Sequence, residues 1–351
     1  MLLLFLKNWT LPTAISVGVV SYLLFAFVPE LDAAGDVLCP IFETLLPLTI
    51  FLTLFVTFSK VDFHLMRVHR WHGAVLLAQF LFVALLLMVI QYAPFDIGTH
   101  VNIFELSGIS VSSRSFRYCL EAVLICVIAP CASASPVVTA KLGGNLTQMT
   151  TFVLLSSFVA SLFIPAVFPM LEPHPGITFL SAFLVILRKL ALVLLLPLFL
   201  GAIVRHQVKP LYRWFVQTPD IGFYLWSVSL AITSGITMKN IVHSEATLWL
   251  LGGIAVLTLL TSFIQFKTGR LIGRIFGEQI CTGQAMFQKN TGLAIWIAYV
   301  YLTPMASIGA GCYVLWQNII NSYELWQHRQ SVVPEPGKAI MPTASRKSTR
   351  P

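Results

Sequence analysis

The sequence predicts an all-α membrane protein whose chain crosses the bilayer several times. Hydrophobic residues make up 57% of the 351 residues and charged residues only 10%, whereas a soluble domain carries about 25% charged residues. Apolar stretches of about 20 residues recur, and each is long enough to cross ~30 Å of hydrocarbon as a helix. The net charge of +8 does not indicate a nucleic-acid partner, because the basic residues lie in short loops and in the C-terminal tail.

Hydropathy predicts ten transmembrane helices within one domain of residues 1–330. They cover residues 11–28, 41–59, 72–92, 118–139, 149–171, 190–204, 221–238, 247–266, 280–303 and 305–327. Ten spans divide into two repeats of five, about 11–171 and 190–327, and an odd number of spans places the second repeat upside down. Residues 331–351 are rich in Pro, Ser, Thr and bases, which predicts a disordered cytoplasmic tail.

Basic residues gather in the loops on one side of the predicted membrane. They are Lys60, Arg67 and Arg70 after the second span, Arg205, Lys209 and Arg213 after the sixth, and Lys267, Arg270 and Arg274 after the eighth. The opposite loops are mainly acidic, although Arg114 and Arg117 lie there in a long loop, where the bias is weaker. The positive-inside rule therefore places both termini in the cytoplasm. Short loops favour a plasma membrane, namely a bacterial inner membrane.

Two predicted spans are interrupted. The fourth breaks at residues 129–136, where Pro130 and Pro136 lack amide donors and leave carbonyl groups without helical partners. The ninth breaks at residues 284–292, which are polar in an otherwise apolar run. In lipid, such backbone is tolerated only where it lines a cavity or is buried in protein.

Interruptions at corresponding positions of two halves are the best sequence indication of a transporter binding site near the bilayer midplane. Amides exposed at the start of a half-helix favour an anionic ligand. For the fourth span alone, the alternative is that Pro130 and Pro136 only kink a packed helix, because proline is frequent in transmembrane helices. The pairing with the ninth span favours the binding site.

Lys289 lies inside the break of the ninth span. A cation at bilayer depth costs about 2.5–3.5 kcal/mol or more unless it is paired or faces a water-filled cavity. Glu121 in the fourth span is a possible partner, but its place near the outer end of the span favours the membrane interface. Glu43 is also expected at the interface, while Asn318 and Asn321 are expected to bond helix to helix.

The breaks carry a family resemblance. The sequence Pro130-Cys131-Ala132-Ser133-Ala134-Ser135-Pro136-Val137 resembles the signature Pro-Gly-Gly-Thr-Ala-Ser-Asn-Val of the bile acid:sodium symporter family. In the ninth span, Asn290-Thr291-Gly292-Leu293-Ala294 is similar to its Asn-Ser-Gly-Leu-Ala. Gln79-Phe80 and Trp316-Gln317-Asn318 look like its patterns in spans three and ten. The resemblance covers about residues 11–330.

The resemblance implies a fold and a function. The fold is two inverted five-helix repeats, with a panel domain (spans one, two, six and seven) and a core domain in which broken spans four and nine cross. The function is secondary transport of a small or amphipathic organic anion by alternating access, without catalysis and with sodium as the coupling ion. By this resemblance, Ser133, Ser135, Thr139 and Asn290 would face the substrate, and Thr291 would add a hydroxyl.

Several family sodium ligands are replaced in this chain. The family's Ser-Asn pair is Ser135-Pro136, and two hydroxyl ligands of span five fall on Met149 and Val153. An alignment without gaps places Ala285 at the position of the family's acidic ligand and Lys289 at the position of its ligating glutamine.

A one-residue insertion would instead place Gln284 at the acidic position and Gln288 at the glutamine. Either way the carboxylate is absent, and only Ser135, Gln79 and, in the second alignment, Gln288 remain. An ammonium donates hydrogen bonds to carbonyls and amides that sodium would bind. We hypothesise that Lys289 replaces a sodium ion, with Gln288 and Gln79 as ion-coupling residues, so that transport is proton-coupled or sodium-independent. Lys289 as counter-ion of the substrate, and Lys289 passively reaching a water-filled vestibule, stay as alternatives.

A second class of function is a non-transporting membrane sensor or partner subunit that kept the fold and lost ion coupling. An enzyme is not expected, because no nucleophile–base pair, metal cluster or nucleotide loop is recognisable. No cofactor is predicted apart from a possible sodium ion, and the predicted partners are a small organic anion and the lipid bilayer. The sequence does not determine the substrate or the oligomeric state.

Overall fold

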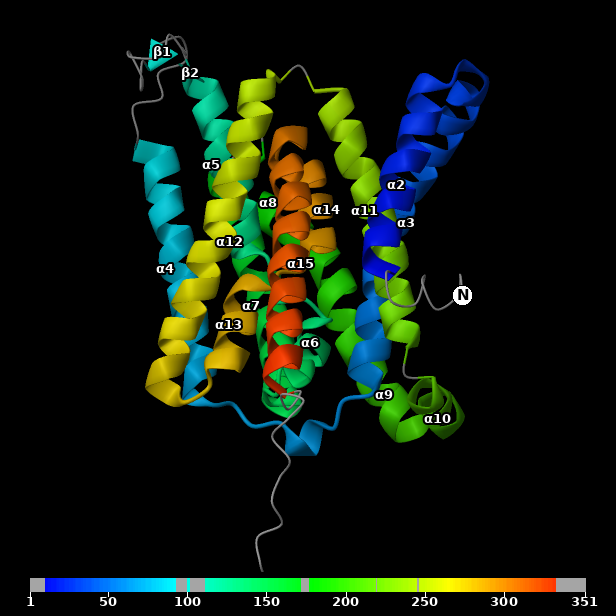
Figure 1. Ribbon diagram of the computed structural model, residues 1–351, viewed down its shortest axis with the longest axis vertical. Helices are drawn as coiled ribbons and strands as arrows, with labels where there is room; N and C mark the ends of the chain where they lie inside the picture. Colours follow the sequence, from blue (N-terminus) through cyan, green and yellow to red (C-terminus); the bar gives the residue numbers. More distant parts are fainter. Residues whose placement is uncertain are drawn as a thin grey trace, which may run out of the picture.

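The computed structural model describes residues 10–92, 100–101, 111–171, 177–218, 220–244 and 246–332, and helices dominate it (Figure 1). The α-helices are α2 (Thr10–Phe27), α3 (Asp32–Ser59), α4 (Arg70–Tyr92), α5 (Ser113–Ile128), α6 (Ser135–Lys141), α7 (Leu146–Leu171), α8 (Phe179–Leu190), α9 (Leu196–Gln207), α10 (Lys209–Gln217), α11 (Ile221–Val242), α12 (Leu248–Phe276), α13 (Gln279–Phe287), α14 (Thr291–Tyr301) and α15 (Pro304–Val332).

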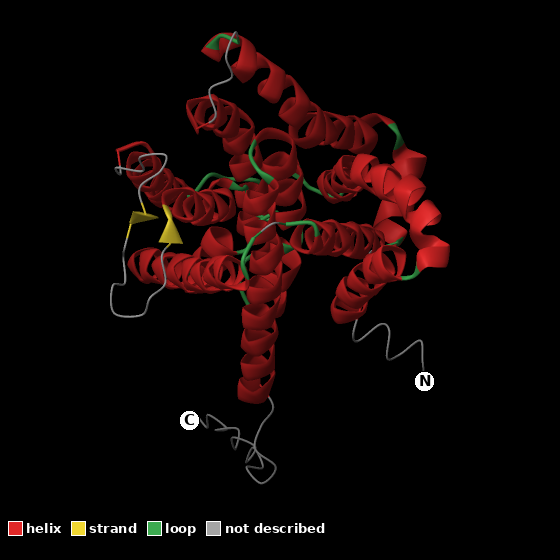
Figure 2. Ribbon diagram, turned by 90° about the horizontal axis from the view of Figure 1, so that it is seen from above, coloured by secondary structure: helices red, strands yellow, loops and turns green. Residues whose placement is uncertain are grey.

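Short elements join some of these helices. The turns η1 (Pro29–Leu31) and η2 (Phe63–Leu65) are 3-10 helices, and the π-helical turn η3 (Ala191–Leu195) joins α8 to α9. Strands β1 (His100–Val101) and β2 (Val111–Ser112) pair antiparallel, with His100 opposite Ser112. In the view from above, the strands lie at one edge of the molecule (Figure 2).

The chain is a multi-pass membrane protein. Five helical stretches are long and apolar enough to cross a bilayer, namely Ala33–Ser59, Arg70–Tyr92, Leu146–Leu171, Phe179–Gln207 and Leu248–Phe276. Leucines such as Leu77, Leu81 and Leu85 are about 60% exposed on α4, as expected for a helix whose partner is lipid. The prediction of an all-α polytopic membrane protein is confirmed.

Several helix boundaries differ from those predicted by hydropathy. Helix α3 begins at Asp32 rather than at residue 41, because Asp32 and Asp36 lower the hydropathy of its first turns without preventing helix formation. The predicted sixth span extends back to Phe179. At the C-terminus, α15 continues to Val332, and the rest of the predicted tail, residues 333–351, lies outside the described residues.

The helices form two packed groups. Helices α2, α3, α9 and α11 contact one another and lie on one side of Figure 1, whereas α4, α5, α12, α13 and α15 contact one another on the other side. Helix α14 packs on α15, α6 packs on α7, and α7 also contacts α8. The groups meet where α11 contacts α15 and where α14 contacts α3. The two broken helices are in the second group.

Glycines let α12 and α13 approach closely. A Cβ atom added to Gly269 would overlap the carbonyl oxygen of Thr282, and one added to Gly273 would overlap the Thr282 hydroxyl and the backbone of Gln279. By contrast, Gly252 on the same helix has no atom within 4 Å of its added Cβ position. Helix α12 therefore supports α13, which carries the second break, by direct backbone contact.

We expect Gly269→Ala to destabilise the protein by about 1–3 kcal/mol, because overpacking forces α12 away from α13. Gly252→Ala is the matched control on the same helix, and it should leave stability unchanged or raise it, because alanine favours a helix over glycine by about 1 kcal/mol. Thermal unfolding of both variants in detergent micelles measures the difference. Equal melting temperatures would contradict the close packing.

Candidate functional site

The two helix breaks meet in space. The segment between α5 and α6 runs antiparallel to the segment between α13 and α14, with Cys131 opposite Lys289. The amide of Ala132 donates to the carbonyl of Gln288 (2.9 Å), and the amide of Asn290 donates to the carbonyl of Pro130 (2.8 Å). We call residues 129–134 and 288–290 the crossover. The pairing inferred from sequence position is thus a direct backbone contact.

Neighbouring helices satisfy the rest of the crossover backbone. On α7, the hydroxyl oxygen of Ser156 accepts from the Cys131 amide (3.2 Å). On α15, Gln317 Oε1 accepts from the Lys289 amide (3.0 Å), and Gln317 Nε2 donates to the Lys289 carbonyl (3.4 Å). Buried peptide groups need such partners, because an unpaired one costs about 1–3 kcal/mol. Gln317 therefore bonds to both the amide and the carbonyl group of Lys289.

The ammonium of Lys289 binds the C-terminal end of α5. Lys289 is 1% exposed, and its Nζ donates to the carbonyl of Val127 (3.0 Å). The side-chain amide of Gln79, on α4, donates to the same carbonyl (2.9 Å) and to those of Ile128 and Ala129 (both 3.2 Å). A helix C-terminus carries partial negative charge and favours a cation.

This environment bears on the alternatives for Lys289. Among the residues that the structure describes, no carboxylate lies within ion-pair distance of Lys289. Its burial does not fit a side chain that reaches passively into a water-filled vestibule. Instead, the side chains of Lys289 and Gln79 both donate hydrogen bonds to carbonyl oxygens at the end of α5. Lys289 and Gln79, both predicted as ion-coupling residues, are brought together at Val127.

A cavity of about 710 Å³ extends from the basic side of the molecule to the crossover. Its walls come from α3 and α11 on one side and from α6, α7 and α15 on the other. At the crossover it is lined by Ser133 and Gln288, and on the basic side by charged residues, namely Lys60, Asp62, Lys141 and Asp220. Burial lowers the pKa of Lys60, and the charge of Asp220 opposes this shift.

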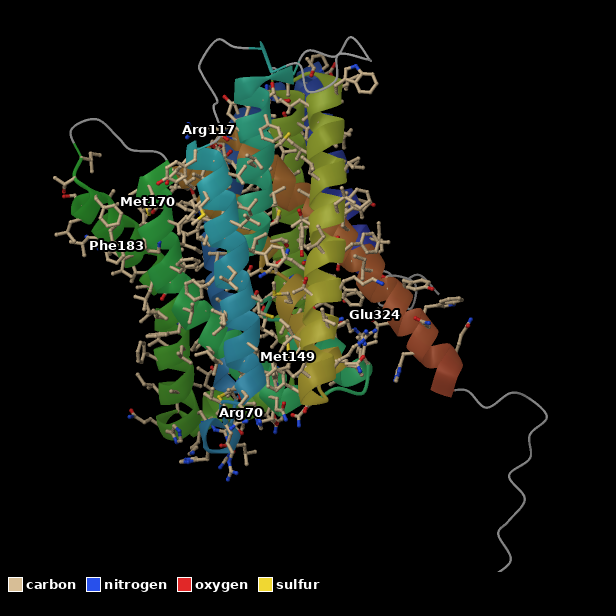
Figure 3. The ribbon with its side chains drawn as sticks, turned by 90° about the vertical axis from the view of Figure 1, so that its left-hand side faces the viewer. Arg70, Arg117, Met149, Met170, Phe183 and Glu324 are labelled. Carbon is tan, nitrogen blue, oxygen red and sulfur yellow. The ribbon has the colours of Figure 1, made fainter. Side chains whose placement is uncertain are left out.

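Arg70 and Arg117 lie near opposite ends of the helices (Figure 3). Arg70 belongs to the basic side, toward which the cavity extends. Arg117 belongs to the other side, where it pairs with Glu121 (2.9 Å) and donates to the carbonyl of Leu171 (2.8 Å).

A small recess of about 20 Å³ lies beside the crossover, at the start of α14. Asn290, Thr291 and Gly292 line it on one side, and hydroxyl residues of α11, Ser229 and Thr233, line it on the other. Asn290 caps α14, because its Oδ1 accepts from the Leu293 amide (3.2 Å). The Thr233 hydroxyl is buried without a hydrogen-bond partner.

Ser133 and Trp226 line both the recess and the larger cavity. The recess therefore adjoins the crossover end of the cavity. Of the five predicted substrate contacts, Ser133, Asn290 and Thr291 line this region.

Ser135 and Thr139 are placed differently. Both are fully buried and line neither space. Pro136 is in the first turn of α6, and the four-residue spacing puts Ser135 and Thr139 on one face, which here is turned toward the protein interior. Ser135 Oγ accepts from the thiol of Cys131 (3.2 Å), and the Thr139 hydroxyl has no partner. Their contact with substrate stays a prediction.

The positions of the family's sodium ligands do not fit sodium. Met149, Val153 and Ala285 are buried and carry no side-chain oxygen, whereas sodium requires hard oxygen ligands. Gln284 is held by Asn321 (3.0 Å) and Glu324 (3.1 Å) on α15, and Glu324, labelled in Figure 3, also pairs with Arg270. Lys289 and Gln79 both donate to the Val127 carbonyl, which fits the alignment without gaps, in which Lys289 occupies the position of the ligating glutamine.

Other polar residues in the spans partly follow expectation. Glu121 is fully buried within the protein, where it pairs with Arg117 one turn earlier, and it does not pair with Lys289. Glu43 pairs with Lys239 between α3 and α11 (2.6 Å). Asn321 bonds to another helix as predicted, but the amide of Asn318 donates to Val314 within its own helix (2.8 Å).

Sequence reasoning missed two supports of the crossover, Gln265 and Tyr313. Gln265 on α12 donates to the Tyr313 hydroxyl (2.9 Å), which donates to the carbonyl of Phe287 at the end of α13 (2.7 Å). A glutamine in an apolar span was the available signal, since buried polar groups in membranes need partners.

These features define a class of protein: a multi-pass membrane protein in which two broken helices cross at the end of a cavity. The chain belongs to the sodium bile acid symporter family, since the model of that family matches residues 47–244, more than half of the chain. The match includes the first break, and it confirms the resemblance found in the motifs. A search of curated proteins gave no match.

We expect Gln317→Leu to destabilise the protein by about 1–3 kcal/mol, because it leaves the buried amide of Lys289 without an acceptor, whereas the Lys289 carbonyl still accepts from the Thr291 amide. Asn318→Leu is the control one residue later, where only a bond within α15 is lost. The measurement is the melting temperature in micelles. If Asn318→Leu lowered the melting temperature as much as Gln317→Leu does, the loss could not be assigned to the hydrogen bond between Gln317 and Lys289.

Proposed function

We propose that this protein is a secondary transporter that moves a small or amphipathic organic anion across the plasma membrane by alternating access. The observation that carries the proposal is that both helix breaks meet at the end of a cavity that extends to the basic side of the molecule. Family membership supports transport in general. Transport by such a fold needs a site reachable from one side at a time, between two groups of helices that can move against each other.

The proposed architecture is one domain of residues 1–330 with two inverted repeats, about 11–171 and 190–327. The breaks between α5 and α6 and between α13 and α14 support it, because each lies in the fourth span of its repeat. Helices α2, α3, α9 and α11 would form the panel, and the group with both breaks would form the core. The basic loops support cytoplasmic termini, so the cavity would open to the cytoplasm.

The substrate proposal rests on the chemistry of the recess and the cavity. The start of α14 carries the positive end of the helix dipole, which favours an anion, and Thr233 offers a hydroxyl without a partner. The cavity volume of about 710 Å³ lies within the roughly 300–1,000 Å³ typical of sites for drug-sized ligands. An anionic group near Ser133, Asn290 and Thr291 would leave the larger cavity for the rest of the molecule.

Lys289 is proposed as a resident cation in place of coupled sodium. Its ammonium donates to a carbonyl at the end of α5, next to the amide of Gln79, and the equivalents of three sodium ligands lack side-chain oxygens. A protonated Lys289 neutralises the carbonyl end of α5 without a sodium ion. Transport would then be sodium-independent or driven by protons, and Gln288, at the cavity wall, would be the remaining ion-coupling side chain.

Uptake of labelled organic anions into proteoliposomes, with sodium and pH gradients imposed separately, tests this function. We expect uptake that ignores sodium, and a roughly ten-fold or larger loss in Lys289→Met, since a hydrogen bond from a charged group contributes about 1.5–3 kcal/mol. Lys267→Met, which removes an exposed lysine on α12, should keep the wild-type rate.

Sodium-stimulated uptake by the wild type would contradict the role of Lys289. Absence of uptake for every anion in the panel would instead favour a non-transporting sensor. Melting temperatures of both lysine variants separate loss of function from loss of folding.

A further inference from the structure

Helix α10 (Lys209–Gln217) is a short helix on the basic side, next to the lower end of α9 in Figure 1. Its nine residues extend about 13 Å, which is too short to cross ~30 Å of hydrocarbon. It connects α9 to α11 and so lies where those helices leave the bilayer. The proposed function does not use it.

One face of α10 is fixed to the protein. Phe215 is buried and packs with Val56 and Val204, and Leu211 and Tyr212 cover the same cluster. The ring of Phe215 meets that of Phe55 edge to face, with centroids 5.6 Å apart. These contacts hold α10 against α3 and α9 and fix which side chains point away.

The other face carries two bases and exposed apolar side chains. Lys209 and Arg213, one turn apart, are exposed, and Trp214 and Val216 beside them are 48% and 51% exposed. Among the described residues, Arg213 has no ion-pair partner. Basic residues with tryptophan on an exposed helix face are typical of helices that lie in the membrane interface.

We propose that the outer face of α10, formed by Lys209, Arg213, Trp214 and Val216, binds anionic lipid headgroups of the leaflet on the basic side of the membrane. Charge complementarity supports this partner, because α10 contains no acidic residue. Two acids on the basic side have other partners: Asp62 pairs with Arg205 (2.6 Å), and Asp220 lies near Lys60 at the cavity. Trp214 and Val216 would enter the headgroup region, which a soluble anionic partner would not require.

The bound lipid would act on the cavity through Arg205. The guanidinium of Arg205 donates to the Tyr212 hydroxyl on α10 (3.3 Å), to the Lys60 carbonyl (3.3 Å) and to Asp62. Lys60 and Asp62 line the cavity. Lipid that holds α10 in place therefore holds the loop at the cavity entrance, and we infer that anionic lipid promotes transport. This second step rests on the proposed function, whereas lipid binding does not.

Binding is tested with the purified full-length protein in micelles, titrated with phosphatidylglycerol or with phosphatidylcholine of the same acyl chains. We expect phosphatidylglycerol to raise the melting temperature and phosphatidylcholine to leave it unchanged. Arg213→Gln should weaken the apparent affinity about five-fold, as expected for one basic residue at an anionic surface. K209Q/R213Q should abolish the shift. Arg213→Gln removes an unpaired exposed side chain, so it keeps the test valid if the double variant does not fold.

The matched control is K267Q/R274Q, which removes two exposed bases of α12 on the same side and should keep the shift. An equal loss in both double variants would mean diffuse charge attraction and would overturn the site. An equal effect of phosphatidylcholine, or an equal shift with glycerol phosphate alone, would overturn it as well.

The link to the cavity is tested with Tyr212→Phe, which keeps the lipid-binding face and removes the hydroxyl that accepts from Arg205. We expect unchanged affinity for phosphatidylglycerol and a smaller stimulation of anion uptake when phosphatidylglycerol is added to proteoliposomes. Full stimulation in this variant would overturn the link and leave the lipid site intact. Binding without any uptake in the wild type would contradict the proposed function, not the lipid site.

Discussion

The structure depends on one constraint: peptide groups that leave a helix inside the membrane must find partners within the protein. Two helices break at matching places, and each break offers the other the hydrogen bonds that it lacks, at Ala132–Gln288 and Pro130–Asn290. Neither break would be stable alone in lipid. Helices α7, α12 and α15 pack around the crossover because they supply the remaining donors and acceptors, among them Ser156 and Gln317. The position of the site therefore follows from the need to pair the buried donors and acceptors of the two breaks.

The same constraint explains where a buried lysine can be tolerated. The last carbonyls of α5 have no helical donors, since the following residues contain Pro130 and turn into the crossover. Gln79 and Lys289 donate to them. An ammonium held there loses its hydration but gains the partial negative charge of a helix end. A sodium ion would bring the same positive charge to the end of α5, but it would also need oxygen ligands. At three of the family's ligand positions this chain has Met149, Val153 and Ala285, whose side chains carry no oxygen.

How far the sequence determines these features depends on the range of the interaction. Apolar length and local breaks are properties of neighbouring residues, so the membrane class and the two interruptions could be predicted. Partner choice depends on which helix faces converge, which hydropathy does not contain. Burial of Glu121 beside Arg117, the inward orientation of Ser135 and Thr139, and the Gln265–Tyr313 support were missed for this reason. Helix α10 was missed because its apolar face covers only one side of a short segment.

The two sides of the molecule are held together differently, and this asymmetry bears on how the helix groups could move. On the basic side, the groups are separated by the cavity and its charged entrance. On the other side, they are in direct contact: Asn240 on α11 donates to the Ser307 hydroxyl on α15 (2.6 Å), and both side chains are buried. Next to this bond, a Cβ atom at Gly311 would overlap Thr237, so α15 lies directly against α11. Opening toward the opposite side would separate this hydrogen bond and the close contact of Gly311 with the Thr237 side chain. A hydrogen bond between neutral groups contributes about 0.5–1.5 kcal/mol, so this bond adds little to the cost of separating α11 from α15 on that side.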